Sequence, residues 1–151
     1  MSGTGEMIRL APNPTNACFG CGGANDAGMK LTFEQDMEGR RIVGKFRLDE
    51  RYQGGAGFLH GGIIAVLFDE ALGKVCRFRS VRAVTAELVI EYLRPIRLHE
   101  EFVVEAHEDR LEGRNLHLVG EIRDANGRVL ARSRGRFVVI DPEKYAEKLK
   151  G

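Results

Sequence analysis

The chain has 151 residues, 23 basic and 22 acidic side chains, and a formal net charge of +1. This length fits a single domain, and the near balance of charge argues against a general nucleic-acid binder. With 30% charged and 43% hydrophobic residues, the composition is typical of a soluble globular protein rather than a disordered or membrane protein. No apolar run approaches the roughly 18 residues of a membrane-spanning helix.

The first part of the chain, residues 1–28, is rich in Gly, Pro, Asn and Ala and shows no sustained period. It is predicted to be an irregular arm that precedes a single domain at 29–151. The N-terminus lacks the apolar segment of a secretion signal. The three cysteines are few and odd in number, so they do not form a disulfide framework. We therefore expect a cytoplasmic protein with reduced thiols.

Two short strands come first, at 30–34 and 42–48, and their spacing predicts a hairpin. A glycine-rich stretch at 53–62 then leads into a segment at 63–75 whose apolar residues cover almost the whole circumference of a helix. A helix of this kind is predicted to be buried on most sides.

Four further strands follow the helix, at 85–93, 102–108, 116–123 and 129–139. The pair Asn126-Gly127 is a strong signal for a tight hairpin turn, and short connections between the four strands predict an antiparallel meander. A short polar helix at 142–150 ends the chain. Because only a curved sheet can enclose the apolar helix, the sequence predicts an α+β fold with the sheet wrapped around one helix.

The tripeptide His60-Gly61-Gly62 stands where the glycine-rich stretch becomes helix. Glycines let a ligand approach the backbone closely, and the first N–H groups of a helix are unpaired and carry partial positive charge. The position therefore suits an anion, or a carbonyl oxygen that gains negative charge. The alternative is an ordinary glycine-rich turn before a core helix.

Asp69 lies nine residues after His60, about two turns into the apolar helix. Ionised carboxylates are rarely buried without a partner, and perturbed carboxylates in such settings are candidates for proton transfer. The alternative is that one stripe of the helix is exposed and that Asp69 and Glu70 are simply solvated. Adjacent helical positions lie about 100° apart, so at most one of the two points into a given cleft.

The run from Tyr52 to Ala71, with its HGG and an aspartate seven residues after the second glycine, resembles the signature of hotdog-fold acyl-CoA thioesterases. The likeness is to the phenylacetate-pathway-like branch of that superfamily. Residues 16–22 with 29–31 resemble the N-terminal arm of many members, and 84–95 resembles the strand after the helix. The resemblance implies a hotdog fold: a curved antiparallel sheet around one long central helix, here with a short C-terminal helix.

This resemblance also implies roles for single residues. Asp69 is expected to be the catalytic carboxylate, either as a general base for water or as a nucleophile. The N–H of Gly61 or Gly62 is expected to polarise the thioester carbonyl, and His60 to shape that loop with a possible polar contact to the same carbonyl. Thr85 stands where some relatives carry a hydroxyl residue that helps to hold the attacking water.

One position departs from the family pattern: Gly54 stands where some relatives have an Asn, and the neighbouring Gln53 is a candidate substitute. Thioester hydrolysis requires a base, an oxyanion donor and an apolar slot for the acyl chain, and no cofactor. Phe58, Leu59 and Phe68 are the expected slot residues.

Arginines are the candidate contacts for the phosphates of coenzyme A. Arg132, Arg134 and Arg136 share one strand face, which is usually a solvated face, whereas Arg94 and Arg97 lie near a strand end. The sequence does not choose among these five arginines, and Arg94 and Arg97 are counted among the expected substrate contacts.

Cys18 and Cys21 have the spacing of half a zinc site. A structural zinc site takes four ligands, and no second CxxC or HxxxH follows, so the spacing predicts a structural arm and no metal site. Cys76, at the end of the helix, is expected to be a small core residue.

Taken together, these features predict hydrolysis of an acyl- or aryl-CoA thioester to free acid and CoA. The alternatives are an acyl-thioester hydratase or dehydratase and a non-catalytic acyl-CoA-binding module. The resemblance further implies a homodimer or homotetramer whose site is formed at the subunit interface. The balanced charge and the lack of a long apolar run predict neither nucleic acid nor membrane as a partner. The residues are compatible with CoA or acyl carrier protein as the thiol carrier.

Overall fold

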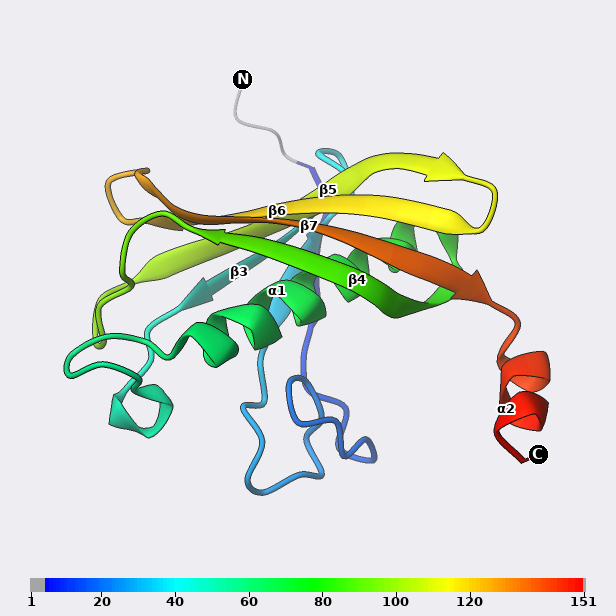
Figure 1. The fold of residues 1–151 in the computed structure, drawn as a ribbon, viewed down its shortest axis with the longest axis horizontal. Helices are drawn as coiled ribbons and strands as arrows, with labels where there is room; N and C mark the ends of the chain where they lie inside the picture. Colours follow the sequence, from blue (N-terminus) through cyan, green and yellow to red (C-terminus); the bar gives the residue numbers. More distant parts are fainter. Residues whose placement is uncertain (1–4, 151) are drawn as a thin grey trace.

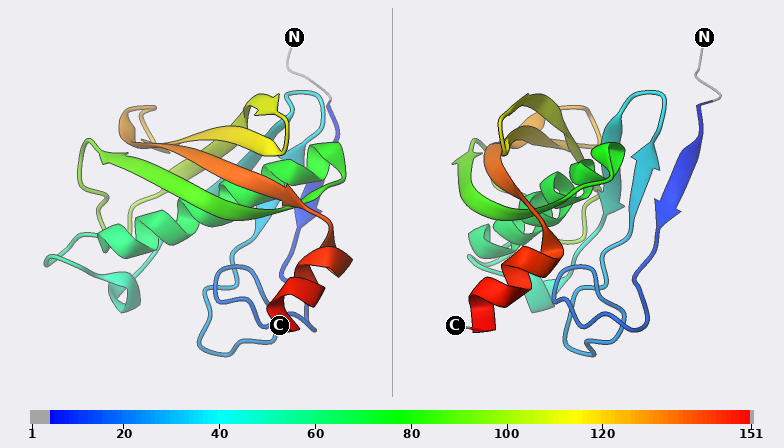
Figure 2. Two further views of the ribbon diagram at one scale, coloured as in Figure 1. Left: turned by 45° about the vertical axis from the view of Figure 1, so that its right-hand side comes forward. Right: turned by 90° about the vertical axis from the view of Figure 1, so that its right-hand side faces the viewer.

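The predicted apolar helix lies in the hollow of a curved antiparallel sheet, as the sequence indicated (Figures 1 and 2). The computed structural model describes residues 5–150, and within that range the sheet has seven strands in the order β1-β2-β3-β5-β6-β7-β4. The strands are β1 (Met7–Leu10), β2 (Phe33–Asp36), β3 (Arg41–Phe46), β4 (Arg82–Tyr92), β5 (Phe102–Glu112), β6 (Asn115–Asp124) and β7 (Val129–Ile140). The helices are α1 (Gly61–Val75), α2 (Pro142–Lys150) and the 3-10 turns η1 (Glu50–Tyr52) and η2 (Cys76–Arg79).

Burial on α1 follows one helical stripe. The side chains that the sheet covers recur at spacings of three and four: Ile64, Leu67, Phe68, Ala71, Leu72 and Val75. They pack against inward-facing residues of the strands in one core cluster, and burial of each large apolar side chain stabilises the fold by about 1.5–3 kcal/mol. Ile63 and Val66, outside this stripe, are only partly buried, so the single chain leaves some apolar surface of the helix uncovered.

Two glycines let the helix approach the sheet closely. A Cβ on Gly120 of β6 would lie 3.1 Å from the Phe68 ring, and a Cβ on Gly135 of β7 would lie 3.0 Å from Leu72 Cδ1. Larger residues at these points would push α1 outward and loosen the core.

The predicted meander of four strands is wrong for β4. Strands β5, β6 and β7 do form consecutive hairpins, but β4 pairs with β7, from Arg82 opposite Ile140 to Tyr92 opposite Ala131. The reason is the connection 93–101, which is too long for a tight hairpin and passes beside the start of α1, where the Leu59 N–H donates to the Ile96 carbonyl at 2.8 Å. Among the described residues, the other edge of β4 has no strand partner.

The segment expected to be irregular contains one strand. Met7–Leu10 forms β1 and pairs with β2, and four residues are too few to show a reliable period in the sequence. Residues 11–32 are otherwise loop and turn, apart from an isolated bridge between Asn13 and Gly22. The boundary between arm and domain at residue 28 stays a prediction.

The remaining elements agree with the sequence to within a few residues. α1 begins at Gly61, two residues before the predicted start, and α2 occupies the predicted range. Among residues 5–150, no helix is both long enough and apolar enough to cross a bilayer.

Candidate active site

Asp69 and Thr85, two of the predicted site residues, are in direct contact. The Thr85 hydroxyl on β4 donates a hydrogen bond to Asp69 Oδ1 on α1 at 2.7 Å. The Asp69 side chain is half-buried, and its second oxygen, Oδ2, has no hydrogen-bond partner within residues 5–150. The carboxylate is therefore oriented by a neutral donor and retains an oxygen that can accept a proton.

A β-bulge places Thr85 on the side of β4 that faces α1. Side chains alternate along a strand, yet Ala83 and Leu88, five residues apart, both pack against the core. The pairing of β4 with β7 shifts register between Thr85 and Glu87, which leaves Ala86 as the extra residue. Bulges commonly redirect a side chain beside a functional site, and this one allows Thr85 to reach Asp69.

A cleft of about 790 Å³ opens beside this pair, between α1, the start of β4 and the N-terminal arm. Both Asp69 and Glu70 line it, so the expectation that at most one of these adjacent acids points into a given cleft was wrong. Four basic side chains contribute to the same lining: Arg9, Lys74, Arg77 and Arg82. The excess of positive charge suits an anionic ligand.

At the other end of the helix, His60 caps the first turn. Its Nδ1 accepts a hydrogen bond from the Gly62 N–H at 2.8 Å, so a neutral ring carries its proton on Nε2. The Ile63 and Ile64 N–H groups donate to the His60 carbonyl. Of the glycine amides considered from the sequence, the Gly61 N–H is the one that donates to no acceptor within residues 5–150.

Tyr92 also contacts this end of the helix, and sequence reasoning missed it. Its hydroxyl donates to the Gly61 carbonyl at 2.9 Å. The signal in the sequence was the alternation from Leu88 through Ile90 to Tyr92, which places all three on the face of β4 toward α1.

Gln53 and Gly54 shape the loop that precedes the helix. Gln53 Oε1 accepts from the Gly57 N–H at 2.9 Å and so closes the loop on itself. A Cβ at position 54 would lie 2.9 Å from the His60 Cα, so this loop conformation requires glycine there. Gln53 is thus occupied with its own loop, and a contact between Gln53 and substrate stays a prediction.

The three predicted slot residues have different environments. Phe68 is fully buried in the core and Leu59 is 6% exposed. Phe58 is half-buried, and the Arg97 guanidinium lies 5.8 Å from the centre of its ring. Phe58 is therefore the most accessible of the three in the single chain.

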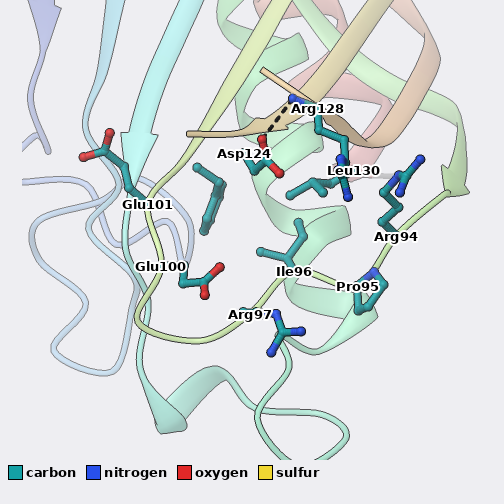
Figure 3. A pocket seen from close by; sticks show the side chains of 10 residues that line it. Arg94, Pro95, Ile96, Arg97, Glu100, Glu101, Asp124, Arg128 and Leu130 are labelled. Atoms are coloured by element: carbon teal, nitrogen blue, oxygen red, sulfur yellow. Dashed lines mark hydrogen bonds between the residues drawn. The ribbon is translucent and has the colours of Figure 1, made fainter. Parts of the chain in front are cut away.

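Arg94 and Arg97 lie together around a separate pocket of about 230 Å³ (Figure 3). Arg128 joins them there, and the acidic residues Glu100, Glu101 and Asp124 share the lining. Of the strand arginines, Arg132 and Arg134 are exposed and line a further pocket of about 250 Å³, and Arg136 donates to Asn115 at 3.2 Å. The structure therefore groups the five candidate arginines into two pairs and one separate residue.

Cys18 and Cys21 lie against Glu70, next to Asp69 on the helix. The Cys18 thiol is 3.4 Å from Glu70 Oε1 and the Lys74 ammonium is 3.3 Å from Glu70 Oε2. Burial, and then the hydrogen bond with Glu70, raise the pKa of Cys21 to about 12. The two sulfur atoms and a carboxylate oxygen lie within 4.8 Å of one another, which makes this cluster the candidate metal-binding group within residues 5–150.

The Asp69 carboxylate and the Gly61 N–H lie far apart on α1. Asp69 is eight residues after Gly61, and a rise of 1.5 Å per residue separates them by about 12 Å along the helix axis. One thioester carbonyl cannot contact both groups in the same chain.

Comparison with solved structures defines the class of fold. A thioesterase superfamily protein of known crystal structure superposes with a TM-score of 0.73 at 31% identity, over 78% of this chain and 57% of that one. The PaaI protein from the phenylacetic acid degradation operon of E. coli superposes with a TM-score of 0.64 at 22% identity, over 68% and 74%. Together with the sheet order and the enclosed helix, these matches identify the hotdog fold.

The family follows from the sequence comparisons. Residues 56–131 match the model of the thioesterase superfamily. The acyl-coenzyme A thioesterase THEM4 of Bos taurus is 35% identical over 118 residues, which is 78% of this chain and 48% of the relative. The chain therefore belongs to the thioesterase superfamily, and it spans about half the length of the THEM4 relatives that it matches.

Proposed function

We propose that the protein hydrolyses an acyl- or aryl-CoA thioester to a free acid and CoA. The observation that carries this proposal is the hydrogen bond of 2.7 Å from Thr85 to Asp69 at the edge of the cleft. Membership of the thioesterase superfamily and the name of the THEM4 relatives support the reaction class. The operon named for PaaI supports aryl groups among the substrates to be tested.

In the proposed reaction, Asp69 acts as the general base through Oδ2. Thr85 holds Oδ1, and Oδ2 accepts a proton from a water molecule as that water attacks the thioester carbon. The carbonyl oxygen becomes an oxyanion, which the free Gly61 N–H at a helix N-terminus stabilises. The C–S bond then breaks, and the thiolate leaves and takes up the proton. In the alternative, Asp69 attacks the thioester carbon directly, the C–S bond breaks with release of the CoA thiolate, and water then cleaves the resulting mixed anhydride to free acid and Asp69.

The Gly61 amide in this scheme comes from a second subunit. Within one chain it lies about 12 Å from Asp69 along the helix, too far to share a carbonyl. The unpaired edge of β4 and the partly covered Ile63 and Val66 offer a surface for a second copy. The proposed active species is a dimer or a tetramer, and a fully active monomer in a sedimentation experiment would contradict it.

The other predicted site residues have supporting roles in this proposal. His60 holds the first turn of α1 through the Gly62 N–H, and Gln53 holds the preceding loop through the Gly57 N–H. Arg94 and Arg97 are the proposed phosphate contacts, because they lie together in the connection beside the helix N-terminus. A cytoplasmic location stays a prediction.

The test is a panel of acyl- and aryl-CoA thioesters assayed with a thiol reagent. Wild type is expected to release CoA from at least one substrate, Asp69→Ala to lose that activity, and Glu34→Ala, an exposed change on β2, to retain it. The panel includes an acyl carrier protein thioester. Failure of wild type to release thiol from any substrate contradicts the proposal. Hydration of an enoyl thioester, or stoichiometric binding without turnover, would favour the hydratase or the binding module instead.

A further inference from the structure

We propose that Cys18, Cys21 and Glu70 bind one divalent zinc ion, which fastens the N-terminal arm to the helix that carries Asp69. The two cysteines lie in the loop between β1 and β2, whereas Glu70 is 52 residues beyond Cys18 on α1. One ligand atom from each of the three residues lies within 4.8 Å of the other two. Spacing in the sequence reveals only two of these ligands, since the third comes from tertiary structure.

The loop is shaped for close approach to the carboxylate. A Cβ on Gly20, between the cysteines, would lie 2.5 Å from Glu70 Cδ, so glycine is what allows Glu70 to lie against the loop. A Cβ on Gly22 would lie 2.3 Å from the Asn16 carbonyl oxygen and 2.4 Å from the Cys18 nitrogen. The tight turn around the thiols therefore depends on both glycines.

Hydrogen bonds hold this turn in place without using the thiols. The Gly22 N–H donates to the Cys18 carbonyl at 2.9 Å, and the Cys18 N–H donates to Asn16 Oδ1 at 2.7 Å. The Leu31 N–H donates to the Gly20 carbonyl at 2.9 Å, which ties the loop to the chain that enters β2. Both sulfur atoms are thus presented to Glu70 by an ordered backbone.

The ligand chemistry favours zinc. Two thiolates and one carboxylate are preferred by Zn²⁺ rather than by Mg²⁺ or Ca²⁺, which take oxygen ligands. Sulfur atoms about 2.3 Å from a tetrahedral zinc lie roughly 3.8 Å apart. The observed spread of 4.8 Å or less therefore needs side-chain shifts of about an ångström. Lys74, 3.3 Å from Glu70 Oε2, offsets the negative charge of the three ligands.

A water molecule supplies the fourth ligand in this proposal. Cys21 and Glu70 both contribute to the lining of the 790 Å³ cleft, so solvent can reach the ion from that side. Because Asn13, Asn16 and Cys21 form part of the same wall, the ion fixes the position of the arm beside Asp69. This inference does not depend on the proposed hydrolysis, since metal binding is measured without any substrate.

The experiment titrates Zn²⁺ into reduced, chelator-stripped protein against a chromophoric competitor, and repeats the titration with Co²⁺. Wild type is expected to bind one ion per chain, with a thiolate-to-cobalt charge-transfer band and the intense visible bands of four-coordinate cobalt. Cys18→Ser and Cys21→Ser are expected to weaken binding at least about 100-fold, and Glu70→Gln about 10-fold, with loss of a ligand in each case.

The matched controls are Cys76→Ala, which removes the thiol outside the cluster, and Asp69→Asn, which changes the neighbouring acid. Both are expected to bind zinc like wild type, and circular dichroism checks that each variant is folded. Zinc should raise the melting temperature of wild type and of both controls, but not of Cys18→Ser. Three observations would each overturn the site: no binding by reduced wild type, equal affinity in all variants, or a Cys18–Cys21 disulfide that persists after reductant.

Discussion

Asp69 and Glu70 are consecutive acids on α1 that line the same cleft, yet their side chains contact two different regions of the molecule. Asp69 faces β4 and accepts one hydrogen bond, from the neutral hydroxyl of Thr85. Glu70 contacts the Cys18 thiol of the N-terminal arm through one oxygen and the Lys74 ammonium of the same helix through the other. Both side chains are half-buried, so burial alone does not distinguish them.

The difference lies in the partners. A thiol and a cation each contact one oxygen of Glu70, which makes it a structural group and a candidate ligand. A single neutral donor orients Asp69 and leaves Oδ2 available for a proton, as a general base requires. An offset of about 100° around the helix is enough to give two neighbouring carboxylates different contact partners.

The strongest test of this contrast replaces each acid by its amide. Asp69→Asn is expected to lower kcat by about 10²–10⁴-fold, because the amide cannot accept the proton of the attacking water. Glu70→Gln is expected to lower kcat less than about 10-fold, since it does not contact the reacting atoms. Steady-state hydrolysis of the best thioester of the panel measures both. An equal loss of kcat in the two variants would show that Asp69 and Glu70 do not differ in their importance for hydrolysis.

The Thr85 hydroxyl gives the next largest effect. Thr85→Val keeps the shape of the side chain and removes the donor to Asp69, and a hydrogen bond to a charged group contributes about 1.5–3 kcal/mol. We expect kcat/KM to fall about 10- to 100-fold, mostly through kcat. Thr85→Ser restores the hydroxyl and should recover most of the activity. If Thr85→Ser is as poor as Thr85→Val, the methyl group and not the hydrogen bond is what matters.

The two regions also differ in how far the sequence predicts them. The helix and the position of Asp69 on it were predictable because the apolar spacing along α1 and the HGG tripeptide are local signals. The hairpin at Asn126-Gly127 was predictable for the same reason, but its turn is not the two-residue form with positive φ at both residues. The φ angle is positive at Gly127 (81°) and not at Asn126, and the Gly127 N–H donates to the Asp124 carbonyl at 3.0 Å.

What could not be predicted depends on contacts between distant segments. The pairing of β4 with β7 follows from the path of the connection 93–101, which has no pattern of its own. The approach of Glu70 to Cys18 joins residues 52 positions apart. The occupation of the Gly62 N–H by the His60 ring, which leaves the Gly61 N–H free, is a matter of side-chain orientation and not of residue type.

On the arm side, a pair of glycine variants tests how closely the loop fits. Gly22→Ala would place its Cβ against backbone atoms, which cannot move independently, and is expected to destabilise the fold by about 1–3 kcal/mol. Gly20→Ala meets the carboxyl end of Glu70, a flexible side chain that can turn aside, so its cost should be smaller. Urea unfolding measures both free energies. Neither variant should disturb Asp69 and Thr85 directly. A larger loss of unfolding free energy in Gly20→Ala than in Gly22→Ala would show that the Glu70 side chain is held rigidly.

The smallest expected effect is the response of the arm to alkaline pH in the metal-free protein. Burial, and then the hydrogen bond with Glu70, raise the pKa of Cys21 to about 12, whereas a thiol in the unfolded chain ionises near pH 8.5, roughly. The unfolded state therefore releases this proton first. The stabilisation that Cys21 contributes is therefore complete at pH values below its pKa in the unfolded chain. It is lost as the pH rises toward its pKa in the folded chain. Because the thiol is partly exposed, solvent screening keeps the loss small.

Urea unfolding in the presence of a chelator measures the free energy of unfolding at about pH 7 and at about pH 10, on either side of the thiol pKa in the unfolded chain. Cys21→Ser removes the titrating group and retains Cys76, whose raised pKa acts equally in both proteins. Wild type should therefore lose more stability between the two pH values than Cys21→Ser does. A difference of the opposite sign would mean that the folded arm stabilises the thiolate. In that case the Glu70 carboxylate would not be the group that keeps the Cys21 thiol protonated in the folded arm.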